Sequence, residues 1–508
     1  MGWHRLRRIL YDDRMFTLTL LHVWLKITLT LRRKFIIFTL TLWQIILQVM
    51  SFYRKQLSNL REWKSQNYRK PLVLRGARQV GKTTLVRLLA KEYDQYIELN
   101  LEKAQDAAYF SKFDSVGKLL SALLLTQKLS PVDKKTTLLF IDEIQEQPEA
   151  IAALRYFYED LPDLHVIAAG SLLEHRLSDV SSFPVGRVQY LYVFPLNFQE
   201  FLQANQMESL VYALEQTPVD AAAHEVAMAW FHKYAMIGGM PEVVQHYVDS
   251  EEVSQLSAVY ESIWGSYVDD VPKYAKNSSE ENVIRHVMRT ASFNIDARIT
   301  FQGFGNSNYR SREVGEAFRA LDDAKVIQLI YPSTSVEVPI IPDFRKSPRL
   351  QILDTGILNH TLGIQADLLA VEDLSNSYKG ALLPHLISQE LITLQDNSYQ
   401  KPLFWVRQKK TSQAEVDLVY MFKGLIFPIE IKSGKVGKLR SLHQFMEQCP
   451  HPYAVRMYAG KFSIESHKTP SGKPFFLMNL PYYLTTYLEQ YLSFFLEEKR
   501  LWMNYVPT

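Results

Sequence analysis

A short stretch near residue 80 carries residue types that bind phosphate. Residues 76–83 read GARQVGKT and fit the pattern G-x-x-x-x-G-K-[ST]. Gly76 and Gly81 let the backbone fold tightly and turn its N–H groups onto a β-phosphate. The Lys82 ammonium can reach the β- and γ-oxygens, and the Thr83 hydroxyl can ligate Mg²⁺. We therefore predict a nucleotide-binding loop made of Gly76, Ala77, Arg78, Gln79, Val80, Gly81, Lys82, Thr83 and Thr84.

An acidic pair follows an apolar run further along the chain. Residues 138–143 read LLFIDE, so that four apolar residues precede Asp142 and Glu143. Asp142 would hold Mg²⁺ through water, and Glu143 would orient the attacking water as a general base. The alternative is a buried strand that ends in a solvated acidic turn. We favour the catalytic interpretation because a phosphate loop stands upstream on the same chain.

Polar residues after the next apolar run are further catalytic candidates. Ser171 stands where a sensor of the γ-phosphate would lie, and a turn serine is the alternative. Arg176 and Arg187 could neutralise transition-state charge, in cis or from a neighbouring subunit of a homo-oligomer, and surface arginines are the alternative. ATP is favoured over GTP because the NKxD-like tetrapeptide at 111–114 precedes the acidic pair, whereas a guanine reader belongs after it.

A second group of charged residues lies near the C-terminus. Residues two apart on a strand share a face, so Glu430 and Lys432 point the same way, and a hairpin would set Asp417 beside them. The two carboxylates could then hold Mg²⁺ while Lys432 positions a water for attack on a phosphodiester, and Glu390 could add a fourth polar group. The alternative is a salt-bridged hairpin in which Lys432 pairs with Asp417 or Glu430.

Alternating short strands and helices must position the first group. Apolar runs that begin at residues 72, 96, 137, 165 and 188 predict strands, and helices are predicted at 84–91, 116–129 and 150–160. This alternation indicates a parallel α/β sheet with crossover helices.

The remainder of the chain divides by pattern. Residues 216–345 are predicted to be mainly helical, and 346–508 to form a small α/β domain. That domain is expected to contain helices at 382–394 and 439–447 and strands at 403–406, 415–422, 425–431 and 453–458. With the ATP-binding part at 51–215, this gives three domains after an apolar extension at 1–50.

Residues 1–50 allow three interpretations. They are non-native sequence translated upstream of a start at Met50, an interfacial membrane anchor, or an ordinary helical extension. The apolar run from residue 35 to 50 is too short to span a bilayer comfortably, and no small-residue cleavage site follows it. Membrane association is therefore expected only if this extension is genuine.

The composition describes a globular protein. Of 508 residues, 47% are hydrophobic and 22% charged, which suffices for real cores, and the net charge of +3 favours no class of partner. The single cysteine, Cys449, excludes an internal disulfide framework and indicates a cytoplasmic location.

Several motifs in order resemble a known family. The loop at 76–85, FIDEIQ at 140–145, AGS at 169–171 and FPLNFQEF at 194–201 resemble the prokaryotic AAA-type ATPases that carry a C-terminal domain of unknown function. GGMP at 238–241 is similar to the glycine–proline signature of their winged-helix-like middle region. The order of C-terminal elements resembles the PD-(D/E)xK nuclease core. The resemblance covers residues 50 to 470 and implies ATP binding and Mg²⁺-dependent hydrolysis.

Two functions follow as hypotheses. The first is an ATPase coupled to a nuclease-like C-terminal domain that binds DNA through a basic cluster near its site. The alternative is a regulatory nucleotide switch whose C-terminal domain is catalytically inactive and binds a protein or nucleic-acid partner. The basic cluster, which solvated loops would also explain, comprises Arg407, Lys409, Lys410, Lys432, Lys435, Lys438 and Arg440, with Trp405 nearby.

Overall fold

The computed structural model describes residues 52–129, 134–171, 184, 186–365, 380–395, 400–408, 414–432 and 439–503, with side chains to residue 498. All but the first of these residues belong to one compact unit, 53–508. The interpretations of residues 1–50, the candidate Arg176 and four lysines of the basic cluster (Lys409, Lys410, Lys435 and Lys438) lie outside the described residues. In the part that is described, no helix combines the length and apolarity needed to cross a membrane.

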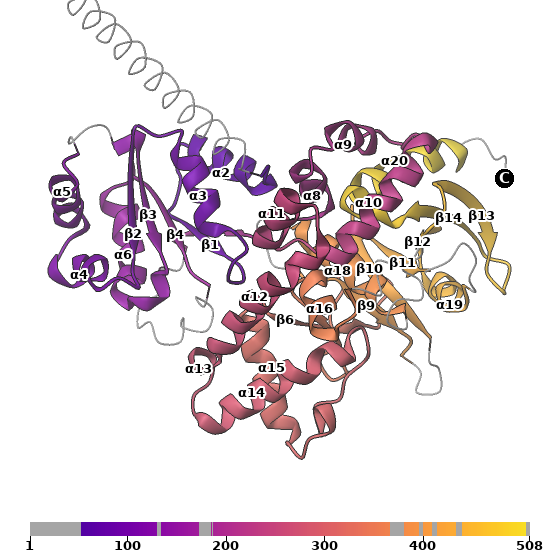
Figure 1. Cartoon of the computed structure of the whole chain (residues 1–508). Helices are drawn as coiled ribbons and strands as arrows, with labels where there is room; N and C mark the ends of the chain where they lie inside the picture. Colours follow the sequence, from indigo (N-terminus) through magenta and orange to yellow (C-terminus); the bar gives the residue numbers. More distant parts are fainter. Residues whose placement is uncertain are drawn as a thin grey trace, which may run out of the picture. The chain divides into compact units, whose positions relative to one another are not determined.

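The N-terminal part of this unit contains a parallel sheet (Figure 1). Five strands lie side by side in the order β2-β3-β4-β1-β5, and every pairing is parallel. This confirms the α/β sheet that the sequence predicts. The strands are β1 (Leu72–Arg75), β2 (Gln95–Asn100), β3 (Thr137–Asp142), β4 (His165–Ala169) and β5 (Gln189–Tyr192).

Helices cover both faces of this sheet, which explains the almost continuous apolar runs of its strands. On one face, α4 (Ala104–Lys112), α5 (Val116–Thr126) and α6 (Pro148–Asp160) share a core with Leu139 and Ile141 of β3. On the other face, α3 (Lys82–Ala90) contacts β3 and β4, and α2 (Lys55–Ser65) packs on α3. Side chains alternate along a strand, so Asp142 at the end of β3 points away from the first face, towards α3.

Helices dominate the next part of the chain. They include α8 (Phe198–Ala204), α9 (Glu208–Leu214), α10 (His224–Ile237), α11 (Pro241–Ser250), α12 (Ser257–Asp269), α13 (Val271–Tyr274), α14 (Ser278–Ala291) and α15 (Ser311–Asp323). A two-stranded antiparallel sheet follows, in which β6 (Ile327–Ile330) pairs with β8 (Arg349–Ile352). The helix α16 (Thr355–Leu362) packs on α10 and α12, so segments on both sides of residue 345 form this part together.

The C-terminal part contains a mixed sheet of seven strands in the order β13-β14-β12-β11-β10-β9-β7. The predicted strands appear as β9 (Leu403–Val406), β10 (Glu415–Phe422), β11 (Leu425–Ile431) and β12 (Tyr453–Tyr458). The edge strand β7 (Pro332–Ser333), the hairpin of β13 (Ser463–Lys468) and β14 (Pro474–Pro481), and the final helix α20 (Leu488–Met503) were not predicted. The helices α18 (Leu382–Thr393) and α19 (Arg440–Gln448) match the predicted ones closely.

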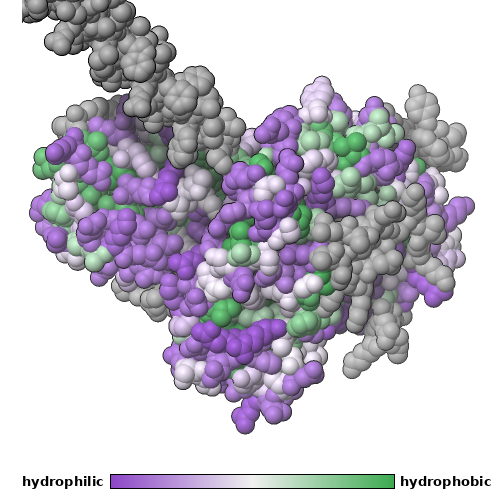
Figure 2. Space-filling model, in the orientation of Figure 1, coloured by the Kyte–Doolittle hydropathy of each residue, from purple (hydrophilic) through white to green (hydrophobic). Residues whose placement is uncertain are grey.

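The exposed apolar residues are dispersed on the face drawn in Figure 2, where small green patches stand among hydrophilic ones. Scattered exposed apolar side chains are normal for soluble surfaces. They therefore identify no interaction site on their own.

Candidate functional site

The loop between β1 and α3 has the backbone geometry that its glycines permit. Gly76 has φ +144° and Gly81 has φ +92°, which are conformations that side-chain-bearing residues rarely adopt. A Cβ at Gly76 would lie 2.2 Å from the carbonyl oxygen of Val193. Gly81 directly precedes α3, so the loop leads into the positive end of a helix. The predicted phosphate-binding loop thus has its expected context of strand, loop and helix.

Lys82 is buried within this loop. Its Nζ donates to the carbonyl oxygens of Gly76 at 3.0 Å and Ala77 at 2.7 Å. Burial lowers the pKa of Lys82 to about 8, although Glu143 and Asp142 oppose the shift. The ammonium therefore rests on carbonyls of its own loop, at the place where phosphate oxygens would compete for it.

Thr83 and Asp142 meet across the space between α3 and β3. The Thr83 hydroxyl donates to Oδ2 of Asp142 at 2.7 Å, and burial raises the pKa of Asp142. A hydroxyl and one carboxylate, completed by phosphate oxygens and water, suit Mg²⁺, which keeps much of its own hydration. Elsewhere in the described residues, no three His, Cys, Asp or Glu side chains gather as a metal-binding group. These two residues therefore fit the predicted ion.

Glu143 occupies an unusual backbone position. Its φ of 51° and ψ of 45° are left-handed, which is uncommon for a non-glycine residue and frequent at functional sites. Its Oε2 accepts a 2.6 Å hydrogen bond from Nε2 of Gln145. A Cβ at Gly170 would lie 2.3 Å from Oε1 of Gln145, so Gly170 leaves the room that this amide needs. Gln145 received no role from the sequence, although it stands within the FIDEIQ motif.

The other catalytic candidates lie at different edges of the sheet. Ser171 follows β4 and is at the carboxyl edge, like the loop and Asp142. Arg187 precedes β5 and is at the opposite, amino edge, where its Nε lies 3.0 Å from Oε1 of Glu159 at the end of α6. The structure does not bring Arg187 to the loop of its own chain, because β5 runs parallel to β1. Only a role from a neighbouring subunit remains as a prediction for it.

Residues of the helical region contact the phosphate loop at Arg78. Nη1 of Arg78 lies 2.6 Å from Oδ1 and 2.5 Å from Oδ2 of Asp270, which follows α12. The Tyr267 hydroxyl donates to the main-chain oxygen of Arg78 at 2.7 Å. On the other side, Arg54 donates to the carbonyl oxygen of Val80 at 3.1 Å. The Arg78 side chain is therefore engaged by the helical region. No sequence signal identified Asp270 as the partner of Arg78, or Arg54 as a partner of the loop at Val80.

Three segments of the chain contact the GGMP motif. Gly239 accepts from the N–H of Leu196 at 2.7 Å and donates to the Asp354 carboxylate at 2.6 Å. A Cβ at Gly239 would lie 2.0 Å from the oxygen of Leu196, so only glycine fits there. Pro241 begins α11, and its Cγ would lie 3.6 Å from a Cβ built on Gly81 of the phosphate loop. The motif thus joins the FPLNFQEF segment, the phosphate loop and the start of α16.

The C-terminal hairpin brings three of the four predicted residues together. The register that pairs Leu418 with Ile429 sets Asp417 opposite Glu430. Nζ of Lys432 lies 2.6 Å from Oε1 of Glu430, which is the contact that the salt-bridge interpretation expects. Oδ2 of Asp417 accepts from the N–H of Ile431 at 2.8 Å.

An arginine from β8 stands among these carboxylates. The guanidinium of Arg349, which is 8% exposed, donates to Glu415, and its Nη1 lies 3.3 Å from Oδ1 of Asp296 and 3.2 Å from the main-chain oxygen of Asp417. Burial, and then neighbouring carboxylates, raise the pKa values of Asp296 and Glu430 to about 7, against the opposing effect of Arg349. We call Asp296, Glu415, Asp417 and Glu430 the carboxylate cluster. Its main cation is an arginine that the sequence did not single out.

Glu390 does not join the carboxylate cluster. Its oxygens accept from the hydroxyls of Tyr234 and Thr486, each at 2.6 Å, and from the N–H of Phe198 at 3.1 Å. Burial raises the pKa of Glu390 to about 7. The expectation of a fourth polar group is corrected, because this face of α18 is turned towards α8 and α10.

Arg407 of the predicted basic cluster and the nearby Trp405 also have structural partners. Trp405 is 1% exposed and packs on Phe445 at 5.3 Å between ring centroids, so it offers no stacking surface to a nucleic acid. Arg407 donates to Gln444 at 3.0 Å.

Comparison with known proteins agrees with the N-terminal geometry. Residues 68–202 match the family model of an AAA domain. Together with the parallel sheet and the loop after β1, this match supports a P-loop ATPase domain in this part of the chain, which is the coarse prediction from the sequence. Residues 228–368 and 379–481 match two different models that are each described as a domain of unknown function.

Matches to whole proteins add little. No curated protein matches the sequence. Among solved structures, a Signal Transduction ATPase with Numerous Domains (STAND) protein with a tetratricopeptide repeat sensor, from Pyrococcus horikoshii, aligns at 13% identity and a TM-score of 0.26. The alignment covers 68% of this chain and 46% of that protein, so this chain spans about half of its length. Such a loose superposition carries no argument about function.

Proposed function

We propose that this chain binds ATP with Mg²⁺ and hydrolyses it, and that the bound nucleotide controls the helical region and the C-terminal part. The carrying observation is the 2.7 Å hydrogen bond between the Thr83 hydroxyl and the Asp142 carboxylate. It joins the two oxygen groups that a magnesium nucleotide needs, beside Lys82. Both lie at the carboxyl edge of a parallel sheet, where the ligands of such sheets bind.

The chain's own groups account for binding and chemistry. Backbone N–H groups of the loop and the positive end of α3 attract phosphate oxygens. The Lys82 ammonium exchanges the carbonyls of Gly76 and Ala77 for β- and γ-oxygens. Glu143, held by Gln145, orients the attacking water and accepts its proton. Mg²⁺, when bound, neutralises charge on the phosphate oxygens.

The nucleotide state reaches the helical region through the loop itself. Asp270 and Tyr267 hold the side chain and the carbonyl oxygen of Arg78, so a loop that adjusts to phosphate changes what these two residues hold. The helices α12 to α15, followed by the sheet of β6 and β8, support the winged-helix-like character proposed for this part. We propose the three domains that the sequence predicts, at 51–215, 216–345 and 346–508, with β8 and α16 of the last one packing on the middle one.

The carboxylate cluster favours a regulatory switch. Arg349 occupies the space among Asp296, Glu415 and Asp417, and Lys432 pairs with Glu430. This internal neutralisation supports a C-terminal part that binds a protein or DNA partner without cleaving it. We propose a cytoplasmic setting, since the buried Cys449 is a free thiol. Homo-oligomerisation and any membrane association through residues 1–50 stay predictions of the sequence.

Nuclease activity is the second candidate function. It is favoured by the convergence of Asp417, Glu430 and Lys432 on one hairpin. Nicking of supercoiled plasmid in Mg²⁺ tests it. Cleavage by wild type that is lost in both Asp417→Ala and Glu430→Ala would establish the enzyme, and cleavage by neither wild type nor variants would leave the regulatory switch.

The ATPase is tested with two substitutions that separate binding from chemistry. We expect Glu143→Gln to retain ATP binding and to lose hydrolysis by about a hundredfold or more, because it removes the base. Lys82→Ala should lose both. If Lys82→Ala binds and hydrolyses ATP as wild type does, the site assignment is wrong. Stimulation of hydrolysis by added DNA distinguishes a nucleic-acid partner from a protein partner.

A further inference from the structure

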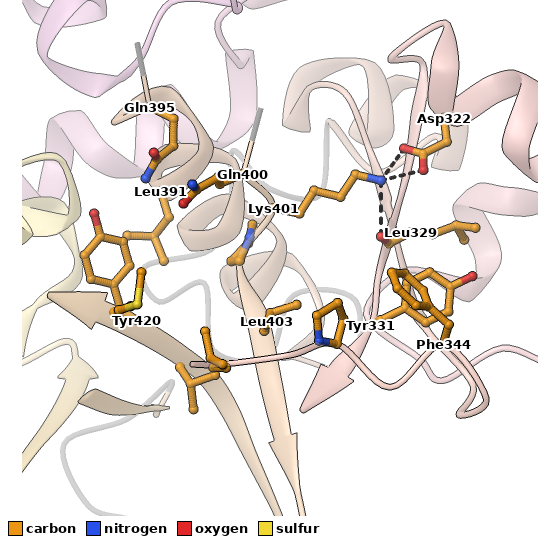
Figure 3. A pocket seen from close by; sticks show the side chains of 15 residues that line it. Asp322, Leu329, Tyr331, Phe344, Leu391, Gln395, Gln400, Lys401, Leu403 and Tyr420 are labelled. Carbon is orange, nitrogen blue, oxygen red and sulfur yellow. Dashed lines mark hydrogen bonds and ion pairs between the residues drawn. The ribbon is translucent and has the colours of Figure 1, made fainter. Parts of the chain in front are cut away.

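A cavity of about 530 Å³ lies between the part of the chain that ends with β8 and the C-terminal sheet (Figure 3). Leu329, Tyr331 and Phe344 come from β6 and the segment after it, whereas Leu391, Leu403 and Val419 come from α18, β9 and β10. Pockets that hold small molecules have volumes of roughly 300 to 1,000 Å³ and favour boundaries between domains. This cavity has the required size and lies at the boundary between the two matched domains of unknown function.

The charges that line the cavity cancel each other. Nζ of Lys401 lies 2.5 Å from Oδ1 of Asp322, and it also donates to the carbonyl oxygen of Leu329 at 3.3 Å. Figure 3 shows this contact at one end of the cavity, where Lys401 reaches across to Asp322. A charged ligand would have to break a close ion pair, so the walls are suited to a neutral one.

The other end of the cavity offers amide groups. Gln395 and Gln400 lie there with Tyr420 and Leu391 (Figure 3). Among the described residues, neither glutamine side chain makes a hydrogen bond, whereas the Tyr420 hydroxyl donates to Glu489 at 2.7 Å. A primary amide both donates and accepts, so the pair complements a ligand group that does the same, such as a carboxamide or a lactam.

Solvent-exposed apolar side chains lie at the rim of the cavity. Phe344 is 70% exposed and Met421 is 49% exposed. Phe344 and Met421 line the cavity, and the Phe344 ring packs edge-on against Tyr331 with 4.9 Å between centroids. Burial of these side chains under an apolar ligand would be favourable by roughly 25 cal/mol for each Å² removed from water.

We propose that this cavity is an effector site for a neutral, mainly apolar small molecule with an amide-type end. The apolar body lies between Leu403 and Phe344, and the amide end meets Gln395 and Gln400. Because the walls of the cavity come from both sides of this domain boundary, the bound molecule fixes the β6–β8 sheet against β9 and β10. The site is separate from the nucleotide loop, and the proposal holds whether or not the chain hydrolyses ATP.

Two probes of matched shape test the chemical class in the full-length protein. By isothermal titration, we expect 1-naphthamide, which is neutral, to bind at one site per chain at least about tenfold more tightly than 1-naphthoate, which is anionic. Gln395→Leu with Gln400→Leu should remove most of that preference. Equal or tighter binding of 1-naphthoate, or no saturable binding of either probe, would overturn the proposal.

Filling variants test the location. Met421→Trp blocks the rim at a half-exposed position, and Leu403→Trp fills the interior, so each should weaken 1-naphthamide binding at least about tenfold. Leu125→Trp, at an 80% exposed position on α5, is the matched control and should change nothing. Undiminished binding by a folded Met421→Trp protein would place the probe elsewhere and refute the site.

Discussion

Nη1 of Arg78 lies 2.6 Å from Oδ1 of Asp270, although 192 residues separate the two in sequence. Arg78 belongs to the phosphate loop, and Asp270 follows a helix outside the ATPase sheet. The Asp270 side chain is 5% exposed and also meets Lys273 at 3.2 Å. The nucleotide loop and the helical region are therefore physically linked through this ion pair, beside the hydrogen bond from Tyr267.

The first prediction concerns the strength of this link. In a double-mutant cycle with Arg78→Gln and Asp270→Asn, we expect a coupling energy of about 1–3 kcal/mol, because the carboxylate is buried and accepts charge-assisted hydrogen bonds. Denaturant unfolding measures it. The matched control is Arg87 with Glu98, where Arg87 is 59% exposed, and its coupling should stay below about 1 kcal/mol. Equal coupling in both pairs would contradict the special role of Arg78.

The second prediction concerns pH and nucleotide affinity. Phosphate oxygens prefer a protonated Lys82, whose pKa burial lowers from 10.5 to about 8 in the free protein. As pH rises through 8, the free protein loses this proton, and binding must restore it. ATP affinity should therefore be flat below pH 8 and fall above it, by up to about tenfold per pH unit. Titrations from pH 7 to pH 9.5 measure this, and a profile without a break would refute the ionisation assigned to Lys82.

The third prediction concerns Gly239, the glycine of the GGMP motif that contacts Leu196. Gly239→Ala should lower the free energy of unfolding by about 2 kcal/mol or more, because the new Cβ would lie 2.0 Å from the oxygen of Leu196. Gly265→Ala is the matched control, since a Cβ there meets nothing within 4 Å on helix α12. It should raise stability by about 0.5–1 kcal/mol, as an alanine does in an open helix. Chemical denaturation measures the free energy of unfolding of both variants. A Gly239→Ala protein as stable as wild type would show that the contact between Gly239 and Leu196 is not tightly packed.

The fourth prediction concerns Arg349. Arg349→Met leaves the carboxylate cluster without its guanidinium and should destabilise the fold by about 3–5 kcal/mol at pH 8. The loss should be smaller at pH 6, because Asp296 and Glu430, whose pKa values are about 7 even beside Arg349, then take up protons and become neutral in the folded variant. Urea unfolding at both pH values measures the difference.

A surface arginine provides the control for Arg349. Arg345 is 91% exposed and pairs with Asp343 at 3.1 Å, so Arg345→Met should change stability by less than about 1 kcal/mol at either pH. An Arg349→Met protein whose loss is equal at pH 6 and pH 8 would contradict the electrostatic explanation and point to lost packing alone.

The nucleotide loop and the parallel sheet that holds it could be predicted from the amino-acid sequence. Local rules suffice there, because two glycines, a lysine and a threonine at fixed spacing follow a buried strand and begin a helix. The same holds for the hairpin that sets Asp417 opposite Glu430, since strand alternation and a short turn fix its register.

The long-range partners of these residues became visible only in the folded chain. Three contacts join segments that are distant in sequence, and no local period or spacing encodes them. They are Arg349 with the carboxylate cluster, Asp270 with Arg78, and Glu390 with Tyr234. Arg187 illustrates the same limit, because the direction of β5 relative to β1 places it at the amino edge of the sheet. Residue types and spacing specify what chemistry a segment offers, whereas packing decides which distant side chain meets it.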